Sequence, residues 1–163
     1  MKKFLSVLAI FSIFILYGCD KQEEVEKKNN IITVNPVDGK LVIDTTNITS
    51  DVTFVNYDSN GVIIQFIVVR GTDGEVRIAF NTCQACNPSP RAYFVQEGEY
   101  LKCENCASLF HIDKIGVEKD GCNPIVVEEK EVSEDKIIIT TDYADTLRDK
   151  FVNWNGITEQ KRS

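Results

Sequence analysis

The cysteine spacing constrains the fold of this chain more than any other feature. Five cysteines lie within forty residues in the second half of the chain: Cys83, Cys86, Cys103, Cys106 and Cys122. The first four form two Cys-x2-Cys pairs separated by sixteen residues. One tight turn can aim both sulfurs of such a pair at a single ion, and two pairs can supply four thiolates in a tetrahedral array. The spacing therefore predicts a metal centre on the first four cysteines, held by two zinc-ribbon-like hairpins.

The fifth of these cysteines, Cys122, has three open roles: a further metal ligand, a spare reactive thiol or a disulfide partner. The segment Gly121–Pro124 repeats the Cys-Asn-Pro order of residues 86–88. Disulfides alone are the ordinary alternative for an exported protein, although five thiols cannot all pair with one another. The metal prediction does not depend on which role Cys122 takes.

Other site chemistries fit the sequence poorly. A c-type haem needs a histidine directly after the Cys-x2-Cys pair, where this chain has Asn87 and Ala107. A thioredoxin-like dithiol needs a helix N-terminus to lower the thiol pKa, but these pairs lie between β-type segments. The only histidine, His111, has apolar neighbours and is expected to be a partly exposed imidazole rather than a ligand. No catalytic constellation is apparent, which favours a binding protein or an electron carrier over an enzyme.

The first eighteen residues resemble a bacterial lipoprotein signal. Two lysines precede the apolar run Phe4–Tyr17, which would span roughly 21 Å as a helix and is short of a ~30 Å hydrocarbon core. Leu16–Cys19 resembles a lipobox, so we expect cleavage after residue 18 and acylation of Cys19. The alternative is an uncleaved N-terminal anchor. A cleaved lipoprotein signal and an uncleaved anchor both predict that the remaining chain lies outside the cytoplasm, tethered to the bacterial cell membrane.

Residues 19–30 are predicted to be the acylated cysteine and a flexible tether, and residues 31–163 a single domain. The tether sequence is charged and has few large apolar residues, so it cannot form a core. Loss of residues 1–18 removes two of the eighteen basic residues and none of the twenty-five acidic ones, which gives a net charge of −9. This acidity excludes polyanion binding, so the membrane contact would come from the lipid and no nucleic acid is expected.

The domain pattern predicts a mainly β fold with one C-terminal helix. Short β-branched runs alternate with turn residues, and the run Val62–Val69 is apolar enough for a strand buried on both faces. Asn60-Gly61 predicts a tight hairpin, and so does Asp73-Gly74. Ile125–Val127 and Ile137–Thr141 are predicted to pair with each other. Asp142 is expected to cap a helix whose core-facing residues recur at helical spacing: Tyr143, Leu147, Phe151 and Trp154.

Several motifs within residues 62–127 resemble the FtrD-like family of membrane iron–sulfur proteins. They are Asp73–Arg77, both Cys-x2-Cys pairs, Glu97–Leu101, Ile112–Gly116 and Gly121–Pro124. The resemblance implies that Cys83, Cys86, Cys103 and Cys106 hold an iron–sulfur cluster. It also implies a role in ferrous-iron uptake beside a permease or another envelope protein. Unlike longer family members, this chain lacks a multi-helix membrane domain.

Spacing alone leaves the metal open, because soft thiolates suit zinc, Cu(I) and iron–sulfur clusters alike. Lys2-Lys3 in place of twin arginines indicates export as an unfolded chain. A cluster would then have to be built outside the cytoplasm, whereas zinc or copper can bind after folding. Three functions follow: a redox or metal-handling lipoprotein for metal uptake, a structural-zinc module that binds an envelope protein or transporter, and, less favoured, a thiol–disulfide oxidoreductase.

Overall fold

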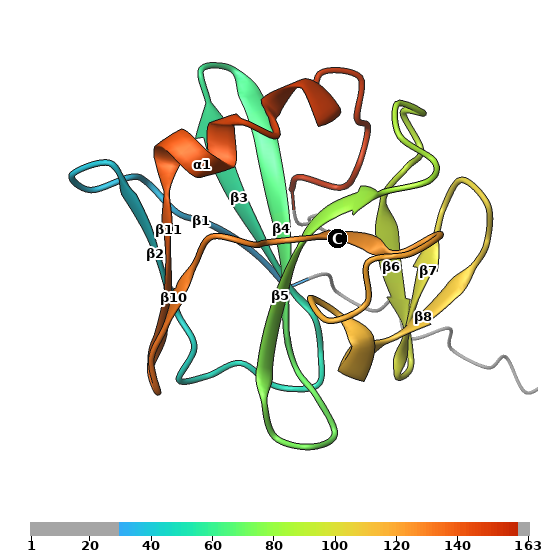
Figure 1. Cartoon of the computed structure of the whole chain (residues 1–163), viewed down its shortest axis with the longest axis horizontal. Helices are drawn as coiled ribbons and strands as arrows, with labels where there is room; N and C mark the ends of the chain where they lie inside the picture. The colour runs from blue at the N-terminus through green and yellow to red at the C-terminus, as the bar shows by residue number, and fades with distance from the viewer. Residues whose placement is uncertain (1–29, 160–163) are drawn as a thin grey trace, which may run out of the picture.

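The computed structural model describes residues 30–159 as three small β-sheets packed side by side (Figure 1). The five-stranded central sheet has the order β1-β3-β4-β5-β9, in which β1 runs parallel to β3 and all other neighbours are antiparallel. Its strands are β1 (Asn30–Thr33), β3 (Thr53–Ser59), β4 (Val62–Arg70), β5 (Val76–Cys83) and β9 (Pro124–Val126). The predicted mainly β class is confirmed. The predicted signal sequence, the predicted lipidation site Cys19 and residues 20–29 of the predicted tether lie outside the described residues, whereas Asn30, predicted to end the tether, begins β1.

The two flanking sheets cover opposite faces of the central sheet (Figure 1). One has the order β10-β11-β2 and consists of Glu131–Val132, Lys136–Thr140 and Lys40–Asp44. The other has the order β6-β7-β8 and consists of Phe94–Glu97, Tyr100–Cys103 and Leu109–His111. Within residues 30–159 no helix is long and apolar enough to cross a bilayer.

Strand β4 is buried on both faces, as its apolar run predicts. Phe66 and Val68 belong to one hydrophobic cluster, which we call the apolar core, whereas Ile67 and Val69 belong to a second, the cysteine-side core. The alternation follows from the two-residue side-chain period of a strand. The preceding hairpin turns at Asn60-Gly61, where both residues have positive φ angles (51° and 84°), as the sequence predicts.

The one polar residue within the apolar run Val62–Val69 of β4 belongs to a buried row of amides. Gln65 donates from Nε2 to Asn56 Oδ1 and to the Ile157 carbonyl, both at 2.7 Å, and accepts from Asn81 Nδ2 at 2.7 Å. Asn56 in turn donates to the Thr158 carbonyl at 2.7 Å. The row thus joins three central strands to the C-terminal segment and satisfies side-chain groups that would be costly to bury alone.

The predicted pairing of Ile125–Val127 with Ile137–Thr141 is wrong. Strand β9 pairs with β5, and β11 pairs with β10 and β2. The sequence signal for both strands was correct, but periodicity does not identify a strand's partner. The acidic segment between them contains β10, which forms the local hairpin with β11 instead.

The C-terminal helix is shorter than predicted. Helix α1 covers Thr141–Asp145. Its N-cap is Thr140, whose side chain accepts a hydrogen bond from the Tyr143 N–H, so the prediction that Asp142 caps the helix is wrong. A 3₁₀ turn, Arg148–Lys150, follows. The expectation that the aromatics pack in the core is confirmed, because Phe151 and Trp154 are buried in the apolar core and Tyr143 packs against it.

Candidate metal centre

Two turns of the same design carry the paired cysteines. Cys83 ends β5 and Cys103 ends β7, so each pair begins where a strand stops. In both turns the residue after the second cysteine closes the loop: the Asn87 N–H donates to the Cys83 carbonyl at 3.0 Å, and the Ala107 N–H to the Cys103 carbonyl at 2.8 Å. The knuckle prediction is confirmed in its local geometry, and neither pair starts a helix.

Strand pairing brings the two turns together. The Cys83 N–H donates to the Ala92 carbonyl at 2.8 Å, which ties the first turn to the chain entering β6. Cys103 lies opposite Phe94 in the β6–β7 register, so the second turn projects from the same small sheet. Ser89 Oγ donates to Asn105 Oδ1 at 2.7 Å and links the turns directly.

A third segment delivers Cys122 to the same place. In the β5–β9 register Pro124 lies opposite Cys83, which sets residue 122 beside the first turn. The Gln84 N–H donates to the Asn123 carbonyl at 3.0 Å, and Asn123 Nδ2 donates to the Glu118 carbonyl at 2.9 Å. The repeated Cys-Asn-Pro order therefore has two structures: the first copy lies in a turn, and the second leads into β9.

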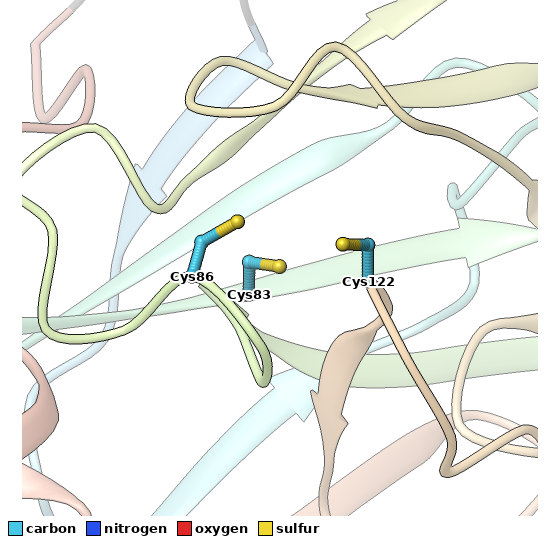
Figure 2. A group of neighbouring side chains, drawn as sticks. All are labelled: Cys83, Cys86 and Cys122. Carbon is cyan, nitrogen blue, oxygen red and sulfur yellow. The ribbon is translucent and has the colours of Figure 1, made fainter.

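The five sulfurs form one cluster, which we call the cysteine cluster: Cys83, Cys86, Cys103, Cys106 and Cys122. Ligand sulfurs of Cys83, Cys86 and Cys122 lie within 4.8 Å of one another (Figure 2). The same holds for Cys86, Cys103 and Cys106. The Cys86 and Cys103 sulfurs are 3.9 Å apart, and those of Cys106 and Cys122 are 3.4 Å apart. All five cysteines are free thiols, so this geometry can bind a metal ion.

The five cysteines of the cluster differ in solvent exposure. Cys83 and Cys103 are fully buried, Cys86 and Cys122 are half-buried, and Cys106 is exposed. Burial raises the pKa of Cys83 and, less strongly, that of Cys86. Hydrogen bonds from the Ser108 hydroxyl and backbone N–H lower the pKa of Cys106 to about 6. The Ser108 Oγ and Cys106 Sγ atoms are 3.3 Å apart. The hydrogen bond with Cys106 raises the pKa of Cys122.

Sequence reasoning missed the residues that support the sulfurs. Besides Ser108, the Asn105 side chain hydrogen-bonds Cys86 and favours its thiolate. Asn123 is fully buried and holds the third segment. The signal available for Asn123 was its place in the repeated Cys-Asn-Pro order; for Ser108 and Asn105 the sequence holds no comparable signal, because their role depends on where the turns meet.

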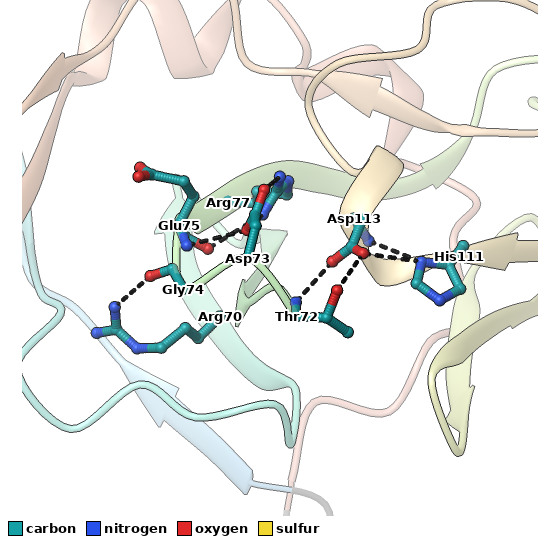
Figure 3. Close-up of polar contacts among 8 residues, drawn as sticks. All are labelled: Arg70, Thr72, Asp73, Gly74, Glu75, Arg77, His111 and Asp113. Atoms are coloured by element: carbon teal, nitrogen blue, oxygen red, sulfur yellow. Dashed lines mark hydrogen bonds and ion pairs between the residues drawn. The ribbon is translucent and has the colours of Figure 1, made fainter.

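His111 takes part in a separate polar group (Figure 3). Its Nδ1 accepts from the Asp113 N–H at 3.2 Å, and the imidazole is 25% exposed, as predicted. Asp113 accepts from the N–H and hydroxyl of Thr72 at 2.7 and 2.6 Å, which fastens the 3₁₀ turn Ile112–Lys114 to the β4–β5 hairpin. Neither cysteine triplet includes His111.

Comparison with known proteins gives one family. Residues 47–151 match the family described as "Membrane iron-sulfur containing protein FtrD-like". The matched segment is longer than the expected 62–127 and includes the whole cysteine cluster, β3 and α1. No curated protein and no solved structure matches the chain.

Proposed function

The chain belongs to the FtrD-like family of membrane iron–sulfur containing proteins, and from this premise we propose that it is a membrane-anchored, extracytoplasmic redox or accessory component linked to iron transport. Its metal centre would be the cysteine cluster, with Cys83, Cys86, Cys103 and Cys106 as ligands. Cys19 would carry the lipid that holds the domain at the membrane.

The convergence of thiols from three separate segments carries this proposal. An iron–sulfur cluster needs four cysteine thiolates, and the described site offers five, with only cysteines in the two triplets. Hydrogen bonds to the sulfurs from Ser108 and Asn105 are of the kind that sets a cluster's reduction potential. The donor set therefore fits the group that the family description names, and a bound cluster would supply one-electron transfer.

The exposure gradient suggests how the chain's own residues would work. Buried Cys83 and Cys103 would exclude water from one side of the centre. Exposed Cys106, with Leu109 57% exposed beside the same turn, would form the edge that a partner approaches. That partner would be a metal permease or another envelope protein at the membrane surface.

Structural zinc is the second candidate, and one sulfur–sulfur distance fits it. A tetrahedral ion with zinc–sulfur bonds of about 2.3 Å has sulfurs about 3.8 Å apart, and the Cys86 and Cys103 sulfurs are 3.9 Å apart. Two thiolates on one iron of a cluster would be equally close, and only thiolates on different irons stand further apart. In this case the domain would be a binding module, and its function would lie on its surface.

Metal analysis with a visible spectrum separates the two. The full chain would be purified anaerobically in detergent. Iron with acid-labile sulfide and broad visible absorption supports the redox proposal. One zinc per chain with a featureless spectrum supports the structural role. Absence of metal after reconstitution with either, and cysteines paired by mass, would contradict both.

A further inference from the structure

The cysteine cluster holds one thiol more than a four-coordinate centre uses. Its sulfurs fall into two overlapping triangles, one made by Cys83, Cys86 and Cys122 and the other by Cys86, Cys103 and Cys106. Cys86 belongs to both. The Cys106 and Cys122 sulfurs are 3.4 Å apart, so they form a third triangle with Cys86, but the first two triangles together use all five sulfurs and share only one. A single tetrahedral ion leaves this arrangement unexplained.

The number of cysteine sulfurs in the cluster fits two three-coordinate metal ions. Two such ions that share one thiolate need five thiolates in all, which is the number present. With metal–sulfur bonds of about 2.3 Å, like those of zinc thiolates, a trigonal ion has sulfurs about 4.0 Å apart. The Cys86–Cys103 separation of 3.9 Å fits this side length and the tetrahedral one equally well, so the donor count carries the argument; every side of both triangles is at most 4.8 Å.

We propose that the metal-free cysteine cluster binds two Cu(I) ions, one in each sulfur triangle, with Cys86 as the bridging thiolate. Zinc and ferrous iron favour four ligands in thiolate sites, whereas Cu(I) is the soft, monovalent ion that accepts three. Thiolates bind Cu(I) as well as zinc and iron–sulfur clusters, so the coordination number of three is what favours Cu(I) here. Neither triangle contains a histidine or carboxylate that would favour a harder ion.

The exposure gradient gives the binding an order. The Cys106–Cys122 edge is the accessible one, so a Cu(I) ion delivered by a small chelator meets these sulfurs first. Binding displaces the thiol protons, because a thiol ligates as its thiolate. The inference rests on the proposed function only in using the same sulfurs; it adds a second kind of metal, and the two can fail separately.

The test is an anaerobic Cu(I) titration of the reduced, metal-free full chain carrying Cys19→Ser, so that only the five clustered thiols bind. Competition with bicinchoninate counts the ions held, and native mass spectrometry counts them independently. We expect two Cu(I) per chain. A Cys122→Ser variant in the same background should bind one Cu(I) and still one zinc, since four thiolates remain and zinc retention reports that the site is folded.

Two results would overturn the inference. The parent could saturate at one Cu(I) per chain, or Cys122→Ser could still bind two. If Cys122→Ser also loses zinc, the parent stoichiometry by native mass spectrometry decides alone. A parent that takes up one Cu(I) yet assembles an iron–sulfur centre refutes only this inference, whereas a parent that binds neither iron nor zinc refutes the proposed function as well.

Discussion

One face of the central sheet is covered by an apolar core, and the other by a small sheet that carries cysteines. On the apolar side Phe80 lies 4.9 Å from Phe66 and 6.1 Å from Tyr143, measured between ring centroids. On the cysteine side the covering strands are four, four and three residues long, and two of the core positions are cysteines. This side also buries Phe94, Leu101 and Phe110 of the small sheet against the central sheet, so hydrophobic packing contributes here too. Hydrophobic packing therefore stabilises both halves of the fold, and we expect a metal bound by the cysteine cluster to complete the cysteine-side half.

Truncation in the apolar core should have the largest effect on stability. Phe80→Ala removes a fully buried ring, so we expect a loss of about 3–5 kcal/mol in the free energy of unfolding. Metal bound per folded molecule should not change. Chemical denaturation with metal analysis checks both, and Val132→Ala, at a 59% exposed position, is the control. Loss of metal from folded Phe80→Ala would show that the two halves are not separable.

Cys103→Ser should act on the other half. The change replaces a buried sulfur with a hydroxyl, which costs about 1–3 kcal/mol if the hydroxyl has no hydrogen-bond partner. Metal content and thermal stability should fall together, and β7 amides should exchange faster while β4 amides stay protected. The half-buried Cys122 provides a matched control, because Cys122→Ser should keep a divalent ion. Unchanged stability in Cys103→Ser would contradict the structural role of the metal.

The two halves were also predictable to different degrees. The hairpin at Asn60-Gly61 and the buried strand β4 were predictable, because turn residues and apolar runs determine the structure of the residues next to them. The Cys-x2-Cys spacing likewise predicted the two cysteine-bearing turns. Pairing of β9 with β5 was not predictable, because a three-residue strand has no pattern that names its partner. That pairing brings Cys122 to the cluster, so the fifth thiol's position had to come from the structure.

Gln65→Leu tests the buried amide row, which lies on the cysteine-side face of the central sheet and is joined to β6 by the hydrogen bonds between Asn81 and Phe94. The change leaves Asn56 Oδ1 and the Ile157 carbonyl without the Gln65 donor, so we expect a loss of about 1–2 kcal/mol. The C-terminal segment should become more accessible to carboxypeptidase. The loss of stability in Gln65→Leu should be compared with that in Gln65→Glu, because a buried carboxylate cannot donate to these two acceptors either. A fully stable Gln65→Leu would show that the row contributes nothing net.

The smallest effect concerns thiol reactivity in the metal-free protein. Because the pKa of Cys106 is about 6, its alkylation by iodoacetamide should reach half its maximal rate near pH 6, while Cys83 stays unreactive. The pKa lies below the ordinary value of 9.0, so any stability that this thiolate adds is complete above pH 9 and is lost as the pH falls through 6. Ser108→Ala should move the reactivity midpoint upward. Identical profiles for parent and variant would contradict the role of Ser108.

We expect a metal bound by the cysteine cluster to complete the cysteine-side half of the fold. The most direct measurement is hydrogen exchange by mass spectrometry on the full chain, with bound metal and after its removal by a chelator under reducing conditions. We predict that removal exposes the amides of β6, β7 and β8 to exchange, that β3 and β4 stay protected, and that returned metal restores protection. Equal protection in both states would contradict the account.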